Sequence, residues 1–215
     1  MQQGSPEWKA ARVGKVTASR IADVLAKTKT GPSTSRTNYL AELVAERLTG
    51  EPVERGFTSA AMQWGTETEA VARDAYAFMV DAEVAECGLF DHPRIGFAAA
   101  SPDGLVGDDG LLEAKCPNSS THIDTLLGET IPAKYRHQML WQMACTGRKW
   151  CDFVSFDPRL PQEMRLFIVR FYRDDIAIAE VEREVAAFLT EVHDTVERLR
   201  DRYIAPAPST VLAAG

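Results

Sequence analysis

The chain has 215 residues, of which 45% are hydrophobic and 26% are charged, and a formal net charge of −7. This composition is ordinary for a soluble globular protein, and the length predicts one domain with a sizeable core. No apolar run reaches the length of a membrane span and the N-terminus has no apolar signal core, so we expect neither a membrane protein nor a secreted precursor.

The N-terminal segment predicts short helices separated by polar breaks. Residues 8–25 read as helical in parts and broken near Gly14, and Thr17 or Ser19 is available to cap a second helix. Residues 27–35 are rich in Gly, Pro, Ser and Thr, which predicts a mobile loop.

Two longer helices are predicted next, over 37–48, ended by Gly50, and over 59–79. In the second of these helices, apolar residues are spaced to face a core, with Glu69 beside the stripe rather than opposite it. The residues of this stripe are Ala61, Trp64, Thr68, Val71, Ala72 and Ala75.

The rest of the chain predicts short strands followed by a long helix. In chain order we expect strands over 82–91, 95–101 and 111–116, a helix over 132–146, and strands over 150–156 and 164–172. The final helix repeats apolar residues at spacings of three and four: Val181, Val185, Phe188, Leu189, Val192, Val196, Leu199 and Tyr203. Helices around a short central sheet predict an α/β or α+β domain over 1–204, and 205–215 is expected to be a flexible tail.

The charges are unevenly distributed along the chain. Residues 1–48 carry eight Lys or Arg against four Asp or Glu, and residues 130–173 carry eight against three. Residues 174–202 reverse this balance, with nine acids against four bases. This pattern indicates either a basic cleft with an acidic exterior or ordinary variation of surface charge.

The four cysteines form no CxxC pair and no zinc-type spacing, which predicts reduced, packed thiols in a cytoplasmic protein. They are Cys87, Cys116, Cys145 and Cys151.

A hairpin near the middle of the chain carries the most informative side chains. Asp109-Gly110 is a tight-turn signal between two apolar segments. Because side chains alternate along a strand, Glu113 and Lys115 share one face, and Asp103 is expected just across the turn, at the end of the first strand. Two carboxylates and an ammonium then converge, which suits Mg²⁺ and a lysine that orients water or stabilises charge on phosphorus.

The alternative for this hairpin is a solvated sheet face with a cross-strand ion pair. Its flanks favour a functional site, because the apolar run 97–100 precedes Asp103 and Pro117 ends the second strand. Charges inside an apolar hairpin are costly unless a metal or partner compensates them.

Five ordered motifs make residues 8–173 resemble a known family, the lambda exonuclease-type, or YqaJ-type, viral recombinase nucleases of the PD-(D/E)xK superfamily. The motifs are Trp8-Lys-Ala-Ala-Arg-Val-Gly-Lys-Val-Thr-Ala-Ser19, Trp64-Gly-Thr-Glu-Thr-Glu69, Ser101-Pro-Asp-Gly104, Leu112-Glu-Ala-Lys-Cys-Pro117 and Tyr135-Arg-His-Gln138. The resemblance implies a restriction-endonuclease-like core, a short mixed sheet flanked by helices.

The resemblance also implies a metal centre. Asp103 and Glu113 match the family's metal ligands, with the Ala114 carbonyl as a backbone ligand, and Lys115 matches the lysine that positions the attacking water. Glu69 matches an acidic residue that serves a second ion, its alternative being a carboxylate on a helix surface. The implied cofactor is Mg²⁺, as two ions, with Mn²⁺ as a substitute.

A phosphate pocket is implied in the same way. Arg12 matches the arginine that binds a terminal 5′-phosphate, a task that suits the forked guanidinium. Ser19 and Ser101 are candidate hydroxyl donors to the same anion. Gln138 matches a glutamine that lines the site. The alternatives are a surface arginine for Arg12 and an ordinary helix-surface glutamine for Gln138.

Two positions fit the family less well. Met62 falls where some relatives place an apolar wedge, although a methionine at helical spacing is usually part of a core. The loop over 28–36 differs in length and composition from the matching region of the family, which removes support for a DNA contact from Arg36.

The implied activity is a Mg²⁺-dependent 5′→3′ exonuclease on double-stranded DNA ends, leaving 3′ overhangs for recombination. The alternatives are a structure-specific or restriction-like endonuclease of the same fold and a non-catalytic DNA-end-binding scaffold. An iron–sulphur nuclease is disfavoured because no cysteine follows Cys151. The resemblance further implies a homotrimer, a single-strand annealing protein as partner, and a phage or prophage protein in a bacterial host.

Overall fold

The computed structural model describes residues 2–29, 31–53 and 60–204, so the side chain of Met62 and the tail 205–215 lie outside the described part. The helices are α1 Pro6–Arg12, α2 Ile21–Leu25, α3 Thr34–Thr49, α4 Ala60–Val80, α5 Ser119–Gly128, α6 Ala133–Thr146 and α7 Asp175–Tyr203, with 3₁₀ turns η1 Ala18–Arg20 and η2 Gln162–Met164. The strands are β1 Val16–Thr17, β2 Lys27–Thr28, β3 Gly31–Pro32, β4 Val84–Ala85, β5 Phe90–Asp91, β6 Ala98–Ala100, β7 Gly104–Val106, β8 Gly110–Lys115, β9 Trp150–Phe156 and β10 Leu166–Tyr172. No described helix is long and apolar enough to cross a membrane.

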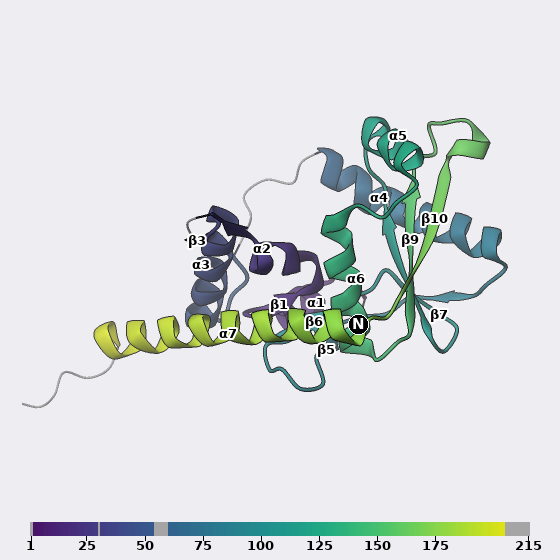
Figure 1. The fold of residues 1–215 in the computed structure, drawn as a ribbon. Helices are drawn as coiled ribbons and strands as arrows, with labels where there is room; N and C mark the ends of the chain where they lie inside the picture. The colour runs from purple at the N-terminus through teal and green to yellow at the C-terminus, as the bar shows by residue number, and fades with distance from the viewer. Residues whose placement is uncertain (1, 30, 54–59, 205–215) are drawn as a thin grey trace, which may run out of the picture.

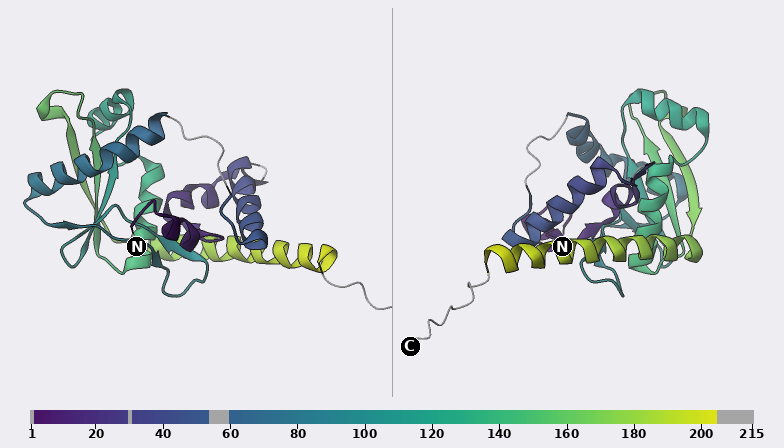
Figure 2. Two further views of the ribbon diagram at one scale, coloured as in Figure 1. Left: turned by 180° about the vertical axis from the view of Figure 1, so that it is seen from behind. Right: turned by 60° about the vertical axis from the view of Figure 1, so that its left-hand side comes forward.

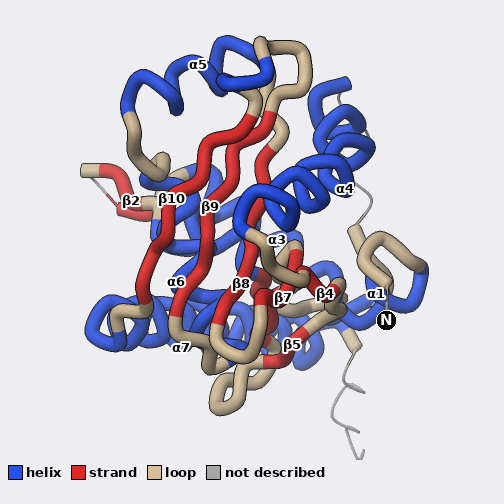
Figure 3. The backbone as a smooth tube through the Cα atoms, turned by 90° about the vertical axis from the view of Figure 1, so that its right-hand side faces the viewer, coloured by secondary structure: helices blue, strands red, loops and turns tan. Residues whose placement is uncertain are grey.

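A five-stranded mixed sheet forms the centre of the fold, in the order β10-β9-β8-β7-β4. Strands β8 and β9 are parallel, and the other neighbours are antiparallel. Figure 3 shows α4 in front of these strands and α6 and α7 behind them. A second, three-stranded sheet, β1-β6-β5, joins α1 and α2 to this frame.

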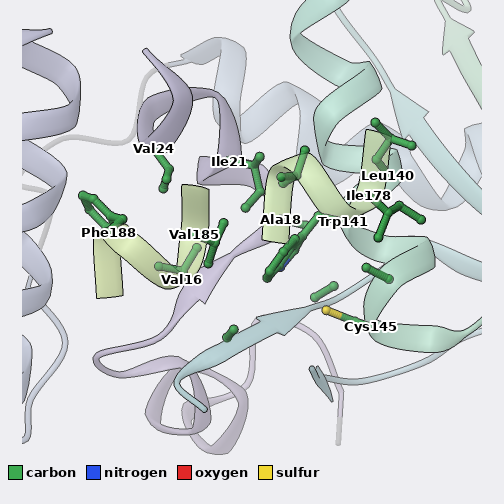
Figure 4. Close-up of a cluster of buried hydrophobic side chains, with 14 of the residues drawn as sticks. Val16, Ala18, Ile21, Val24, Leu140, Trp141, Cys145, Ile178, Val185 and Phe188 are labelled. Atoms are coloured by element: carbon green, nitrogen blue, oxygen red, sulfur yellow. The ribbon is translucent and has the colours of Figure 1, made fainter. Parts of the chain in front are cut away.

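The sheet separates two apolar clusters. Leu112 and Ala114 of β8 pack with Tyr76 of α4 on one side, whereas Leu111 belongs to the larger cluster on the other side. The larger cluster gathers side chains of β1, α2, α6 and α7 near Trp141, as Figure 4 shows. The expected alternation of side chains along 111–116 is therefore confirmed.

The long helix α7 extends from the side of the central sheet to the N-terminal helices α2 and α3 (Figure 1). Figures 1 and 2 show it running past the sheet and on beneath α2 and α3. Acids along it pair with bases from other parts of the chain, among them Glu184 with Lys27 at 3.0 Å, Glu191 with Arg36 at 2.6 Å and Glu182 with Arg94 at 2.7 Å. The acidic segment of the sequence thus compensates bases that are packed against it. The contact between Arg36 and Glu191 also gives Arg36 a structural role.

Several local predictions need correction. Residues 27–35 contain the β2–β3 hairpin, and Ser33 caps α3 by accepting a hydrogen bond from the Arg36 N–H at 3.2 Å. In α4, Val71 is 52% exposed, whereas Tyr76 is fully buried. No element was predicted between 116 and 132, where the structure has helix α5. Asn118 caps that helix, accepting from the Thr121 N–H at 2.9 Å.

The hairpin turn also differs from the prediction. Strand β7 begins after Asp103, so this residue lies at the open end of the hairpin rather than across the turn. The residue in the left-handed conformation is Gly107, with φ 50°. Gly110 pairs with Val106 and begins β8. Asp103 and Glu113 nevertheless meet, because the antiparallel register brings the open ends of the two strands together.

Gly110 is needed for packing rather than for its conformation. A Cβ at this position would lie 2.2 Å from the Trp150 indole. The Arg170 guanidinium lies over that ring, 3.6 Å from the centroid. We expect Gly110→Ala to lower the free energy of unfolding by about 1–3 kcal/mol, as overpacking does. Urea unfolding measures this loss, with Gly96→Ala as the control, since a Cβ there meets nothing within 4 Å. Equal losses in both variants would contradict the packing argument.

Candidate active site

The carboxylate of Glu113 is buried between β8 and α6. It is fully buried, and its Oε1 accepts from Gln138 Nε2 at 2.6 Å. Its Oε2 accepts from Gln142 Nε2 at 2.5 Å. Lys115, whose side chain is 26% exposed, forms an ion pair with Oε1 through its Nζ. The structure therefore brings Glu113, Lys115 and Gln138 together, and adds Gln142.

Asp103, the residue before β7, approaches the same point. Its backbone N–H donates to the Leu112 carbonyl at 3.1 Å, and its Oδ2 accepts from the Ala114 N–H at 2.8 Å. These two bonds fix the carboxylate against β8, one residue from Glu113 and Lys115. Within the described part of the chain, Oδ1 accepts no hydrogen bond, so one edge of the carboxylate remains available.

Burial and neighbouring charges shift the pKa values of this cluster. Burial raises the pKa of Asp103 well above its usual range, and the charges of Glu113 and Glu69 raise it further. The charge of Lys115 and the hydrogen bond from the Ala114 N–H lower this pKa, but by less. Burial also raises the pKa of Glu69, opposed by Lys115 and Arg73. For Lys115, burial lowers the pKa, but the charges of Glu113 and Asp103 outweigh it, so the pKa is raised and the ammonium stays charged.

Helix α4 contributes Glu69 and, one turn later, Arg73. Arg73 donates from Nη1 to the Asp103 carbonyl at 3.0 Å, and the same nitrogen lies 3.7 Å from Glu69 Oε1. Its Nη2 donates to Glu86 at 2.7 Å. Arg73 was missed in the sequence, although the spacing of four residues from Glu69 is a usable signal for a helical ion pair.

A cavity of about 450 Å³ opens beside these residues. The N-terminal segment closes one side of it, and Gln3 Nε2 donates to the Pro102 carbonyl at 2.7 Å. The cavity is lined by Gln2, Gln3, Gly4, Trp8, Thr66, Glu69, Ala70, Arg73, Glu86, Cys87 and Asp103. Asp103, Glu69 and the indole of Trp8 therefore face one space.

Trp8 links this cavity to the candidate phosphate-binding residues. Its Nε1 donates to Ser101 Oγ at 2.9 Å, and the Arg12 guanidinium lies over its ring, 4.0 Å from the centroid. Arg12 also donates to Thr17 Oγ1 at 3.2 Å, and burial lowers its pKa. Ser19 is exposed on η1 and forms no hydrogen bond with this group among the described residues. The hydroxyl at Arg12 thus comes from Thr17, which the sequence did not single out for this role.

The donor set fits a hard divalent cation. Among the described residues no three His, Cys, Asp or Glu side chains are grouped tightly enough to hold a metal alone. Mg²⁺, however, is commonly held by one or two carboxylates together with substrate phosphates and water. Asp103 and Glu113 supply two such carboxylates, and because burial and the charge of Glu113 raise the pKa of Asp103, a bound cation would offset the cost of ionising it.

Two solved structures resemble most of this chain. An alkaline exonuclease from Laribacter hongkongensis, LHK-Exo, matches with a TM-score of 0.86 and 53% identity, over 92% of this chain and 97% of that one. The same enzyme has been solved in complex with dAMP. A phage-related exonuclease from Haemophilus somnus shares the fold, with a TM-score of 0.70 and 17% identity over 86% of this chain and 96% of that one.

A viral relative matches over a shorter stretch. The uncharacterized protein R354 of Acanthamoeba polyphaga mimivirus is 32% identical over 107 residues, 42% of this chain, and the match spans 19% of that protein's length. The model of the YqaJ-like viral recombinase domain matches residues 7–149. This match, together with the fold shared with LHK-Exo, confirms the predicted mixed α/β nuclease fold. The chain belongs to the YqaJ-like viral recombinase domain family, a family of nucleases.

Proposed function

We propose that this nuclease is a divalent-metal-dependent exodeoxyribonuclease that degrades double-stranded DNA from its ends in the 5′→3′ direction. The observation that carries the proposal is the short segment Ser101-Pro102-Asp103. Ser101 Oγ accepts a hydrogen bond from the indole of Trp8, and the Arg12 guanidinium lies over that ring. Two residues later, Asp103 lies beside Glu113 and Lys115. A phosphate bound at Arg12 would thus lie beside the residues proposed to cut the next bond. The dAMP complex of LHK-Exo supports DNA as the class of substrate.

Asp103, Glu113 and the Ala114 carbonyl are the proposed ligands of one Mg²⁺ or Mn²⁺ ion, and Glu69 is the proposed ligand of a second. When bound, such ions neutralise phosphate charge and lower the pKa of water. Lys115 stays protonated and donates to the attacking water or to the phosphate oxygens. Gln138 donates a hydrogen bond to Oε1 of Glu113 and so helps to keep that carboxylate in place during the reaction.

The direction of degradation is assigned to Arg12. A guanidinium forks onto two phosphate oxygens, and Arg12 is held in place by the Trp8 ring and Thr17. An enzyme that seats the terminal 5′-phosphate in this way cuts the adjacent phosphodiester. Ser101 and Ser19 remain the proposed hydroxyl donors to the same phosphate.

Arg12→Ala tests this assignment. Charge-assisted hydrogen bonds contribute about 1.5–3 kcal/mol, so the preference for 5′-phosphorylated over 5′-hydroxyl ends is expected to fall by about 10- to 100-fold. Initial rates on both linear duplexes give the ratio, with the exposed Arg94→Ala as control. An Arg12→Ala enzyme that kept the full preference would refute the phosphate pocket.

The homotrimer and the annealing partner implied by the family resemblance belong to this proposal as well. Sedimentation of the purified chain measures its mass in solution, and a monomer under assay conditions would contradict the homotrimer.

A further inference from the structure

Glu113 is held by two glutamines from the same face of α6. Gln138 and Gln142 are one helical turn apart, and each donates to a different oxygen of the carboxylate, at 2.6 Å and 2.5 Å. Gln138 lies nearer the solvent, whereas Gln142 is fully buried. The proposed metal ligand is thus held both from the core, by Gln142, and from the half-buried side, by Gln138.

Gln142 is itself held at both ends of its amide. Its Oε1 lies 3.8 Å from Cys151 Sγ, a weak donor on the neighbouring strand β9. Because the Glu113 carboxylate accepts and does not donate, Nε2 must be the atom that faces it. The amide therefore has one orientation that satisfies both neighbours, and this orientation fixes the plane of the Glu113 carboxylate.

The surroundings of Gln142 make a purely structural role a poor explanation. Its neighbours along α6 are buried and apolar: Met139, Leu140, Trp141, Met143 and Ala144. An amide in such a place is costly unless it is hydrogen-bonded, and an apolar residue would fill the space without that cost. The one carboxylate that Gln142 reaches is the one proposed to bind the metal.

We infer that Gln142 is a positioning residue for catalysis, which holds Glu113 in the orientation needed to bind the divalent ion. This inference rests on the proposed function. Partners that hold a metal ligand from behind typically contribute about 10- to 100-fold in metal affinity or activity. Because Gln142 lies behind Glu113 and away from the solvent, DNA binding should not depend on it.

The test is Gln142→Met, which keeps the length of the side chain and removes its donor. We expect kcat on linear duplex DNA to fall about 10- to 100-fold, with KM for DNA within about twofold of wild type. Mn²⁺ affinity, measured by calorimetry without DNA, should fall by a similar factor. The control is Gln63→Met, which removes an exposed amide–carboxylate bond, Gln63 Nε2 to Glu67 Oε1 at 2.8 Å.

A second variant guards against misfolding. Gln142→Asn keeps the amide but withdraws it by one methylene, so the same separation of kcat from KM is expected with a smaller loss. Wild-type kcat and Mn²⁺ affinity in a folded Gln142→Met enzyme would overturn the inference. So would parallel losses of kcat, DNA binding and thermal stability in both variants. If wild-type protein binds no Mn²⁺ and needs no metal to cleave, it is the proposed function that fails.

Discussion

Lys115→Ala is expected to lower the rate of DNA cleavage by about 10²–10⁴-fold, the range of a positioned acid–base or charge-stabilising group. Lys115 is the one ammonium that pairs with Glu113 in the described site, and its pKa is raised by Glu113 and Asp103 although burial lowers it. Its charge is therefore present throughout the pH range in which nucleases are assayed. DNA binding, measured by fluorescence anisotropy in Ca²⁺, should persist in this variant.

The same substitution should strengthen metal binding. The Lys115 ammonium occupies Oε1 of Glu113, the oxygen that also accepts from Gln138. It therefore competes with a divalent cation for the carboxylate and repels it by like charge. We expect the Kd for Ca²⁺, measured by calorimetry without DNA, to fall roughly tenfold, which corresponds to about 1.4 kcal/mol.

Lys149→Ala is the matched control, because Lys149 pairs with Asp109 at 2.8 Å on the exposed hairpin turn. Neither cleavage nor Ca²⁺ binding should change in that variant. Weaker Ca²⁺ binding in Lys115→Ala than in wild type would show that the lysine supports the metal site instead of competing for it.

Asp103→Asn should remove metal binding while preserving the hairpin. The amide oxygen of asparagine can still accept from the Ala114 N–H, the bond that Oδ2 makes at 2.8 Å. Because the negative charge that would hold the metal is lost, the several kcal/mol by which the metal stabilises the transition state are lost as well. The rate of cleavage should therefore fall by at least about 10³-fold. Calorimetry with Mn²⁺ and initial cleavage rates measure the two effects.

The melting temperature of Asp103→Asn in EDTA should rise. Burial and the charges of Glu113 and Glu69 raise the pKa of Asp103, so the ionised carboxylate destabilises the metal-free fold at neutral pH. Asp108→Asn, at an exposed position of the turn, should change neither the melting temperature nor the cleavage rate. An Asp103→Asn enzyme that binds Mn²⁺ as wild type does would exclude Asp103 from the metal site.

The sequence allowed prediction of those parts of the site that local geometry determines. The alternation of side chains along β8 was enough to place Glu113 with Lys115. The turn was misplaced because Asp109-Gly110 is a stronger local signal than Gly107, whose left-handed φ was not evident from sequence. Gly110 is instead required by the Trp150 ring from β9, a contact between distant segments.

Residues that act through tertiary contacts escaped prediction. Gln142 reads as part of an apolar helix, and only the docking of α6 onto β8 brings its amide to Glu113. Arg73 reads as the polar face of α4, yet it reaches the Asp103 carbonyl and Glu86. In α4, periodicity alone did not distinguish Val71 from Tyr76, because the packing of the helix against the sheet decides which of its faces is covered.

The most direct test of the account is digestion of 5′-phosphorylated linear duplex DNA and covalently closed circular DNA in Mg²⁺ and in EDTA. The account predicts release of mononucleotides from linear DNA in Mg²⁺, no release in EDTA, and intact circles in both. Cutting of closed circles would contradict it and identify an endonuclease, and binding of DNA ends without any cleavage would identify a scaffold.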